Sequence, residues 1–137
     1  MEIKNDSLTP ELFLDLYRSV GWEAPVLPQV REALKNTLAV FTAYEDHQAV
    51  GMVRLIGDGG MSFYIKDFVV LPAFQSQGVG AALLAHAEKY IRETIDPHWA
   101  VSLELISTKE AVGFYKKQGF EERPCAWDGP GMFKMIR

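Results

Sequence analysis

A glycine-rich segment that follows an apolar run is the part of this sequence best suited to bind a phosphate. Residues 69–84 read VVLPAFQSQGVGAALL, so a strand-like run ends at a proline and a helical pattern begins near Gly78 and Gly80. The N–H groups of a first helical turn lack intrahelical partners and carry the positive end of the helix dipole. Glycines leave out the side chains that would keep a phosphate at a distance. The segment therefore predicts an anion site that needs no Lys or Arg.

Two familiar nucleotide-binding motifs fit these glycines poorly. A P-loop places Lys and then Ser or Thr directly after its second glycine, whereas Gly80 is followed by Ala81 and Ala82. A Rossmann fingerprint requires a third small residue, and Leu83 stands in that place. The glycines are equally compatible with a helix start that binds no ligand, because short glycine motifs also occur by chance.

The elements that position this segment follow from changes in the hydrophobic period along the chain. A capped helix is expected from Thr9-Pro10 to Gly21, and a shorter helix around Val30. Three strand-like runs then predict an antiparallel meander, at 38–44, 49–56 and 61–71. A helix is then expected from Gly78 to Asp96-Pro97, followed by a strand at 99–106 that runs parallel to the third run. A last helix is expected at 108–118, and two final strands at 120–127 and 132–136. This order predicts an α+β fold, with a mixed β-sheet flanked by helices in a single domain over residues 1–137.

Composition limits the partners of this domain. The chain has 137 residues, and 14 Lys and Arg against 18 Asp and Glu give a net charge of −4. This balance argues against nucleic acid as a partner and suits a cationic substrate. No apolar run approaches the roughly 20 residues that span a bilayer, so no membrane partner is expected. The single cysteine, Cys125, fits a reducing compartment, and we expect a cytoplasmic protein. The three histidines share no metal-ligand spacing, so no metal is expected.

Two motifs in this chain resemble those of the GNAT superfamily of N-acetyltransferases. Residues 75–80, QSQGVG, are similar to Gln/Arg-x-x-Gly-x-Gly/Ala, and Val-Leu-Pro at 70–72 is similar to the strand end that precedes it in the family. Residues 111–120, AVGFYKKQGF, resemble the family's Ala-x-x-Phe-Tyr-x-x-x-Gly-Phe. Two motifs in the family's order are more specific than either alone. The resemblance implies a GNAT-like splayed sheet and the direct transfer of an acetyl group from acetyl-coenzyme A to a primary amine.

The resemblance also implies a cofactor site, residue by residue. The pyrophosphate is expected at the loop and at the amides of the helix start, formed by Gln75, Ser76, Gln77, Gly78, Val79, Gly80 and Ala81. The pantetheine arm is expected to pair, as an added strand, with the backbone of Phe68, Val69 and Val70. In the family, the two parallel strands diverge at a bulge in the first. Thr108 stands where the family often has Asn, and its hydroxyl can still donate a hydrogen bond to the cofactor.

Acetyl transfer requires a neutral amine, a donor to the oxyanion and a proton for the leaving thiolate. A lysine-like amine has a pKa of ~10.4, so under about one in a thousand is neutral at neutral pH, and a base should help. The resemblance implies that the Val70 N–H supports the oxyanion and that Tyr115 contacts the cofactor and acts as general acid. Tyr115 also fits a purely structural role as an aromatic in a helix.

Two carboxylates compete for the role of general base, and water is a third alternative. Glu104, in Leu-Glu-Leu, resembles the Leu-Glu-Val of the ribosomal-protein alanine acetyltransferases, although alternation along the strand could also turn it to solvent. Asp67 is the rival, because an acid there also occurs in some glucosamine-phosphate acetyltransferases. Lys66 departs from the Glu-Asp pair of those enzymes. Glu104 and Tyr115 are the catalytic residues predicted here.

The resemblance leaves the acceptor and part of the function open. The acceptor is expected to be a small-molecule amine or an amine of a peptide or protein. Trp22 and Glu23 lie between the first two helices, where the family often builds the acceptor pocket. A non-catalytic module of the same fold, which binds acetyl-coenzyme A as a sensor or partner, is the alternative function. A homodimer is compatible with the expected C-terminal hairpin.

Overall fold

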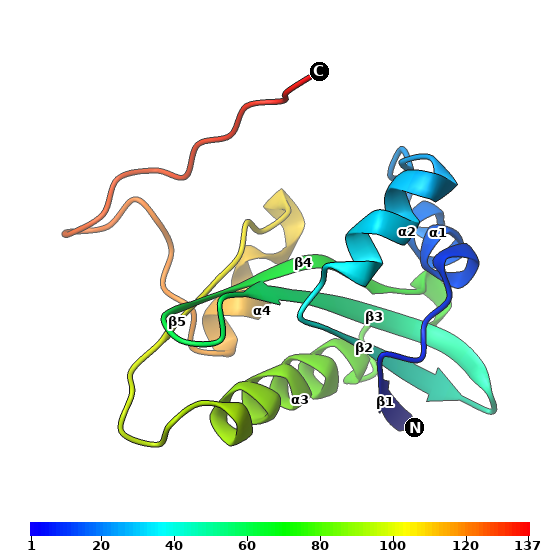
Figure 1. Cartoon of the computed structure of the whole chain (residues 1–137), viewed down its shortest axis with the longest axis horizontal. Helices are drawn as coiled ribbons and strands as arrows, with labels where there is room; N and C mark the ends of the chain where they lie inside the picture. The colour runs from blue at the N-terminus through cyan, green and yellow to red at the C-terminus, as the bar shows by residue number, and fades with distance from the viewer. The chain divides into compact units, whose positions relative to one another are not determined.

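The computed structural model describes all 137 residues and divides them into two compact units, residues 1–104 and residues 105–137. The first unit contains one five-stranded sheet, ordered β1-β2-β3-β4-β5 (Figure 1). Its strands are β1 (Glu2–Asn5), β2 (Ala39–Glu45), β3 (Gln48–Gly57), β4 (Ser62–Val70) and β5 (Ser102–Glu104). The first four strands pair antiparallel, and β5 pairs parallel to β4, so the expected mixed α+β sheet is confirmed.

Two short helices cover one face of this sheet. Helix α1 (Pro10–Ser19) begins where the sequence predicts, because the Thr9 hydroxyl accepts the Leu12 N–H at 3.2 Å. It ends before Gly21, whose φ of +82° is a left-handed conformation that glycine adopts readily. Helix α2 (Leu27–Lys35) follows. The apolar stripes of both helices and the facing strand residues form one buried cluster, made of Phe13, Leu14, Leu16, Val30, Met52 and Val69.

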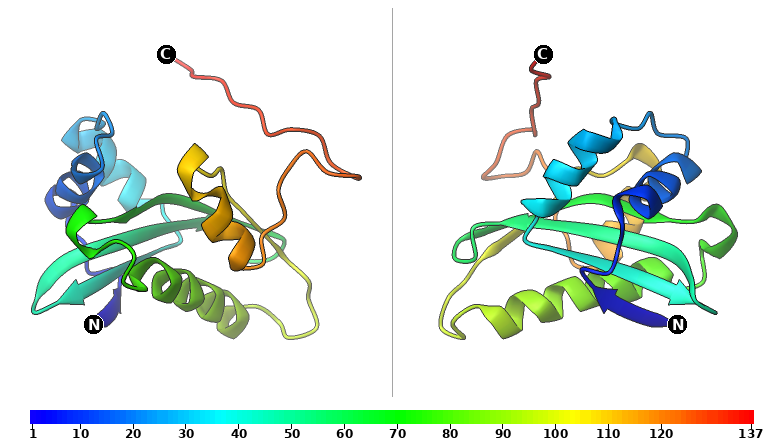
Figure 2. Two further views of the ribbon diagram at one scale, coloured as in Figure 1. Left: turned by 180° about the vertical axis from the view of Figure 1, so that it is seen from behind. Right: turned by 45° about the vertical axis from the view of Figure 1, so that its right-hand side comes forward.

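A longer helix, α3 (Val79–Thr94), covers the opposite face of the sheet (Figure 2). Its contact with β3 is close at Gly51, where an added Cβ would lie 3.1 Å from Leu83 and 3.2 Å from Val79. The Phe41 ring of β2 meets the Tyr90 ring edge-to-face at 5.2 Å. No helix of the chain is both long and apolar enough to cross a membrane. The central strands β2 and β3 are thus largely buried, with helices on both faces of the sheet.

The second unit contains a 3-10 turn, η2 (Lys109–Ala111), and one helix, α4 (Val112–Lys117), within the predicted 108–118 segment. Gly119, with a φ of +92°, ends this helix as expected. The two strands predicted at 120–127 and 132–136 are wrong, because neither segment forms a strand. Pro124 and Pro130 lack the N–H that a ladder needs, and the Cys125 N–H bonds locally to the Asp128 carbonyl at 2.9 Å.

Two other differences concern the sheet. Strand β1 was not predicted, because its four residues are mostly polar and show no period-2 alternation of apolar side chains. Pairing with β2, including Ile3 opposite Ala43, creates the strand. Strand β5 has three residues, shorter than the predicted 99–106, and it pairs only with Ser62–Tyr64 of β4.

Candidate active site

The first turn of α3 presents N–H groups that no side chain caps. Its first backbone hydrogen bond runs from the Ala82 N–H to the Gly78 carbonyl at 3.0 Å, so the N–H groups of Val79, Gly80 and Ala81 lie ahead of it. Gly78 precedes the helix with a φ of +85°, and no atom lies within 4 Å of the place where its Cβ would be. The glycine is therefore required by conformation and not by packing. The turn has the free donors and the dipole that bind an anion.

Two glutamines brace the loop before this turn, and one of them ties it to the end of β4. The Gln75 amide nitrogen donates to the Val70 carbonyl at 3.0 Å, and the Gln77 amide nitrogen donates to the Ala73 carbonyl at 3.1 Å. Between them, Ser76 has a φ of +60°, an uncommon conformation for a residue other than glycine. The loop predicted to bind pyrophosphate is thus a defined turn tied to the strand predicted to bind the pantetheine arm.

A bulge interrupts β4 just before that end. Met52 of β3 pairs with Val69, and Arg54 pairs with Lys66, so two residues of β4 oppose Val53 alone. The first of these two is Asp67, whose φ is +50°. This is the bulge that the family resemblance implies in the first of the two parallel strands.

Hydrogen bonding on the far side of the bulge turns Val70 toward the open edge of β4. The Leu71 N–H donates to the Val50 carbonyl at 2.8 Å, and antiparallel pairs alternate between bonded and non-bonded. Val70, paired with Gly51, is therefore a non-bonded position, with its N–H and carbonyl directed away from β3. Since β5 pairs with β4 only up to Tyr64, this edge is not covered by β5. An extended ligand with amide groups can pair there as an added strand.

Glu104 is the last residue of β5 and lies directly opposite Tyr64. Tyr64 in turn opposes Ile56, which shares a face of β3 with Met52 of the buried cluster. Glu104 is therefore on the sheet face that α1 and α2 cover, at the point where β4 and β5 stop pairing. Its side chain is half-buried. Burial raises the pKa of Tyr64, and the Glu104 carboxylate adds to that rise.

The rival carboxylate, Asp67, is engaged by an arginine. The Arg54 Nε donates to the Asp67 Oδ2 at 2.7 Å, and the two side chains are only 16% and 12% exposed. Tyr17 of α1 lies near this pair: burial raises the pKa of Tyr17, the Asp67 carboxylate adds to the rise and Arg54 opposes it. Tyr17 also meets the Trp22 ring edge-to-face at 5.1 Å, and Trp22 packs against the buried cluster. Asp67 is therefore held in a largely buried ion pair with Arg54, near Tyr17.

The remaining predicted site residues lie in the second unit. The Tyr115 ring packs edge-to-face against Phe114 at 5.2 Å and Phe120 at 5.8 Å. Burial raises the pKa of Tyr115, so its hydroxyl stays protonated, as a general acid requires. Thr108 immediately precedes η2, and its carbonyl accepts the Ala111 N–H at 3.2 Å.

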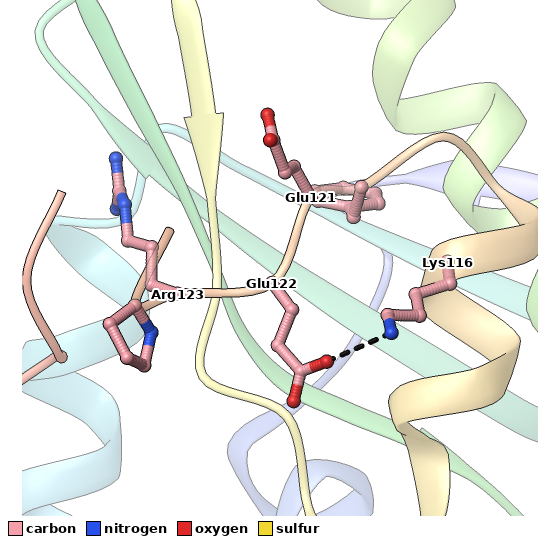
Figure 3. A pocket seen from close by; sticks show the side chains of 6 residues that line it. Lys116, Glu121, Glu122 and Arg123 are labelled. Carbon is pink, nitrogen blue, oxygen red and sulfur yellow. Dashed lines mark ion pairs between the residues drawn. The ribbon is translucent and has the colours of Figure 1, made fainter. Parts of the chain in front are cut away.

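A surface hollow of about 430 Å³ in the second unit contains none of the predicted site residues (Figure 3). Its walls carry charges of both signs, and the Lys116 ammonium pairs with the Glu122 carboxylate at 3.0 Å. The lining residues are Lys116, Phe120, Glu121, Glu122, Arg123 and Pro124. Nothing in this set concentrates one charge or adds to the residues predicted for the site.

Comparisons with known proteins agree with the motifs. Residues 17–135 match the model of the acetyltransferase (GNAT) domain. An uncharacterized N-acetyltransferase, ycf52, from Pyropia yezoensis is 31% identical over 97% of this chain and 79% of that protein. A histone acetyltransferase, TAP1, from Glycine max is also 31% identical, over 77% of this chain and 48% of that protein.

Solved structures show the same relationship. A GNAT-family acetyltransferase from Streptococcus pneumoniae is 34% identical, with a TM-score of 0.79 over 99% of this chain and 98% of that one. A probable acetyltransferase from meticillin-resistant Staphylococcus aureus is 31% identical, with a TM-score of 0.85 over 98% of each chain. On its motifs, its sheet and these matches, the chain belongs to the GNAT superfamily of N-acetyltransferases.

Proposed function

We propose that this chain transfers the acetyl group of acetyl-coenzyme A directly to a primary amine. The observation that carries the proposal is the uncapped first turn of α3, tied by Gln75 to the open edge of β4. An anionic pyrophosphate fits the turn, and the amides of a pantetheine arm fit the edge. Residues 69–84 contain no Lys or Arg, so the backbone dipoles of the turn would supply the attraction.

The residues of the first unit would bind and orient the acetyl donor. The N–H groups of Val79, Gly80 and Ala81 would donate to the pyrophosphate oxygens. The outward backbone groups of Phe68 to Val70 would pair with the arm. The Gln75 amide uses one lone pair of the Val70 carbonyl and leaves the second available. When bound, acetyl-coenzyme A supplies an activated acetyl thioester.

Two proton transfers and the support of the oxyanion would then fall to three groups of this chain. Glu104, directly or through one water, would accept a proton from the incoming ammonium, because only the neutral amine is a nucleophile. The Val70 N–H would donate to the acetyl oxygen as negative charge develops there. Tyr115, kept protonated by burial, would donate its proton to the departing sulfur. The C–N bond would form as the C–S bond breaks, and the acetylated nitrogen would then lose its second proton. That proton, carried through water, would restore the Tyr115 phenol, and the proton taken by Glu104 would pass to solvent.

The acceptor is proposed as a class only. The net charge of −4 and the Glu104 carboxylate favour a cationic amine, which a small molecule, a peptide or a protein can supply. The TAP1 relative is named as a histone acetyltransferase, which supports protein amines as members of the first panel to be tested.

The test combines binding with turnover. Acetyl-coenzyme A should raise the melting temperature, and free thiol should be released when the best of a panel of amines is added. Gly80→Val places a branched side chain in the first turn of α3 and should abolish the thermal shift while the fold survives. Gly60→Val is the matched control, because Gly60 lies in the β3–β4 turn, where an added Cβ would meet only Asp58 Oδ1 at 3.9 Å.

Three results decide between the alternatives. Normal binding by Gly80→Val would show that the cofactor site has been misplaced. Binding without thiol release, across small amines, peptides and proteins, would favour the sensor or partner module. A thermal shift with ATP or NAD but none with acetyl-coenzyme A would overturn the proposal altogether.

A further inference from the structure

The bulge in β4 decides which residue faces the open edge of the strand. Without it, Val69 and not Val70 would oppose Gly51, because every later residue would shift by one place. The shift would turn the Val70 N–H inward to β3, and it would move the Val69 side chain out of the buried cluster. The edge used by the proposed cofactor therefore depends on the bulge staying at Asp67.

The conformation at the bulge is unfavourable for the residue that adopts it. Asp67 has a φ of +50°, and Asp tolerates this left-handed conformation better than most residues but less well than Gly. Such conformations persist where the surroundings determine them, and they concentrate at functional sites. An interaction that holds Asp67 in place is therefore expected.

Arg54 supplies that interaction and links it to α2. Its Nε bonds Asp67 Oδ2 at 2.7 Å, and its Nη1 bonds the Thr37 Oγ1 at 3.3 Å. The Thr37 hydroxyl in turn donates to the Ala33 carbonyl in α2 at 2.6 Å. Arg54 also pairs across the ladder with Lys66, the residue just before the bulge. The planar guanidinium thus joins three separate points: β3, the bulge and the end of α2.

We propose that Arg54 is a positioning residue, which holds the Asp67 bulge and thereby keeps the Val70 edge of β4 open to the cofactor. Thr37, Arg54 and Asp67 together are called the Arg54 clamp below. The consequence for acetyl transfer rests on the proposed function, whereas the effect on β4 does not. In this role the Asp67 carboxylate pairs with Arg54, and a group other than Asp67 accepts the proton of the amine.

The first arm of the test reads the strand in the protein without ligand. Arg54→Met keeps much of the length of the side chain and removes its charge and donors. Hydrogen exchange should show at least a 10-fold loss of protection at the Leu71 N–H, which bonds Val50 only while the register holds. Amides of the β2–β3 ladder, such as that of Phe41, should change far less. Arg92→Met is the matched control, because it breaks an exposed ion pair with Glu88 on α3 and should change neither.

The second arm reads the cofactor. Arg54→Met and Asp67→Asn should each raise the Kd for acetyl-coenzyme A at least 10-fold. The Kd of the double variant should lie within about 2-fold of the higher of the two single-variant values. Such non-additivity is the signature of two residues that act as one unit. Arg54→Lys keeps the charge but lacks the planar fork, so it should restore part of the affinity and also provides a folded variant if Arg54→Met is unstable.

Two results would overturn the inference. One is an unchanged exchange pattern and Kd in folded Arg54→Met. The other is Asp67→Asn with normal Kd, lowered kcat and a greater loss at pH 7 than at pH 9, which would identify Asp67 as the base. If the parent protein does not bind acetyl-coenzyme A, the proposed function fails, and the exchange arm still decides whether the clamp holds the bulge.

Discussion

The left-handed turn at Gly78 provides a prediction in which stability and binding can be separated. Gly78 adopts a φ of +85° in front of α3, and nothing lies within 4 Å of an added Cβ. A substitution there meets no steric contact, so its cost is conformational. Gly78→Ala should therefore lower stability by the price of a left-handed alanine, roughly 1–2 kcal/mol.

This cost converts into a measurable melting temperature. A change of 1 kcal/mol shifts the midpoint by about 4–8 °C in a chain of 60–100 residues and by about 2–4 °C in one of 150–250. For a chain of this length, between the two, Gly78→Ala should melt roughly 3–10 °C lower. Gly78→Asn should lose less than the alanine variant, although Asn is larger, because Asn adopts this conformation more readily.

Thermal unfolding with and without acetyl-coenzyme A measures both quantities. A ligand at 100 times its Kd stabilises by about 2.7 kcal/mol, and a 10-fold weaker Kd would reduce this gain to about 1.4 kcal/mol. Both variants should lose part of this gain, because each puts a side chain beside the donors of the first turn. Gly60→Ala, at a glycine without a positive φ, should not lower the midpoint. If Gly78→Ala melts like the parent, or costs no more than Gly78→Asn, the conformational argument is wrong.

Two further predictions concern the proton transfers. Tyr115→Phe keeps the ring contacts with Phe114 and Phe120, so the melting temperature and Kd for acetyl-coenzyme A should barely move while turnover falls about 10-fold or more. Because the pKa of Tyr115 is raised, its acid function should be present through neutral pH and lost only as the pH rises through a value above the ordinary ~10. If Tyr115→Phe turns over at the rate of the parent at every pH, Tyr115 has only a packing role. Glu104→Gln should lose more rate at pH 7 than at pH 9, since neutral amine is scarcer at the lower pH. An equal loss at both values would leave water or Asp67 as the base.

The sequence predicted most of the first unit because its local signals agree with its packing. Thr9 caps α1 and Gly78 precedes α3 at the residues that the pattern indicates. The C-terminal strands failed for the opposite reason. The mostly apolar run at 132–136 predicts a strand, but a strand requires a hydrogen-bonded neighbour. In the structure Met132 and Phe133 are 93% and 90% exposed, and no ladder forms.

The ion pair between Asp67 and Arg54 could not be predicted from the sequence. Its residue type, and the acid found at this place in some glucosamine-phosphate acetyltransferases, made Asp67 a candidate base although Lys66 departs from the pattern of those enzymes, and the family's bulge was expected in this strand. Arg54 lies 13 positions earlier in an apolar run, and no spacing rule relates it to Asp67. The ion pair depends on the β3–β4 register, which the bulge itself sets. A contact that requires the tertiary register cannot be read from local periodicity.

The placement of charge in the first unit explains how an acidic chain could serve two ligands of opposite sign. The first turn of α3 offers backbone N–H groups to an anion, and α3 covers one face of the sheet (Figure 2). Glu104 lies on the other face, with Asp67 already paired to Arg54. The Val70 edge of β4 lies between the face covered by α3 and the face that carries Glu104. Arg or Lys at the α3 turn would strengthen phosphate binding but would repel a cationic amine along the same edge. Backbone dipoles act only over the first helical turn, so in the proposed function they would attract the phosphate without repelling the amine.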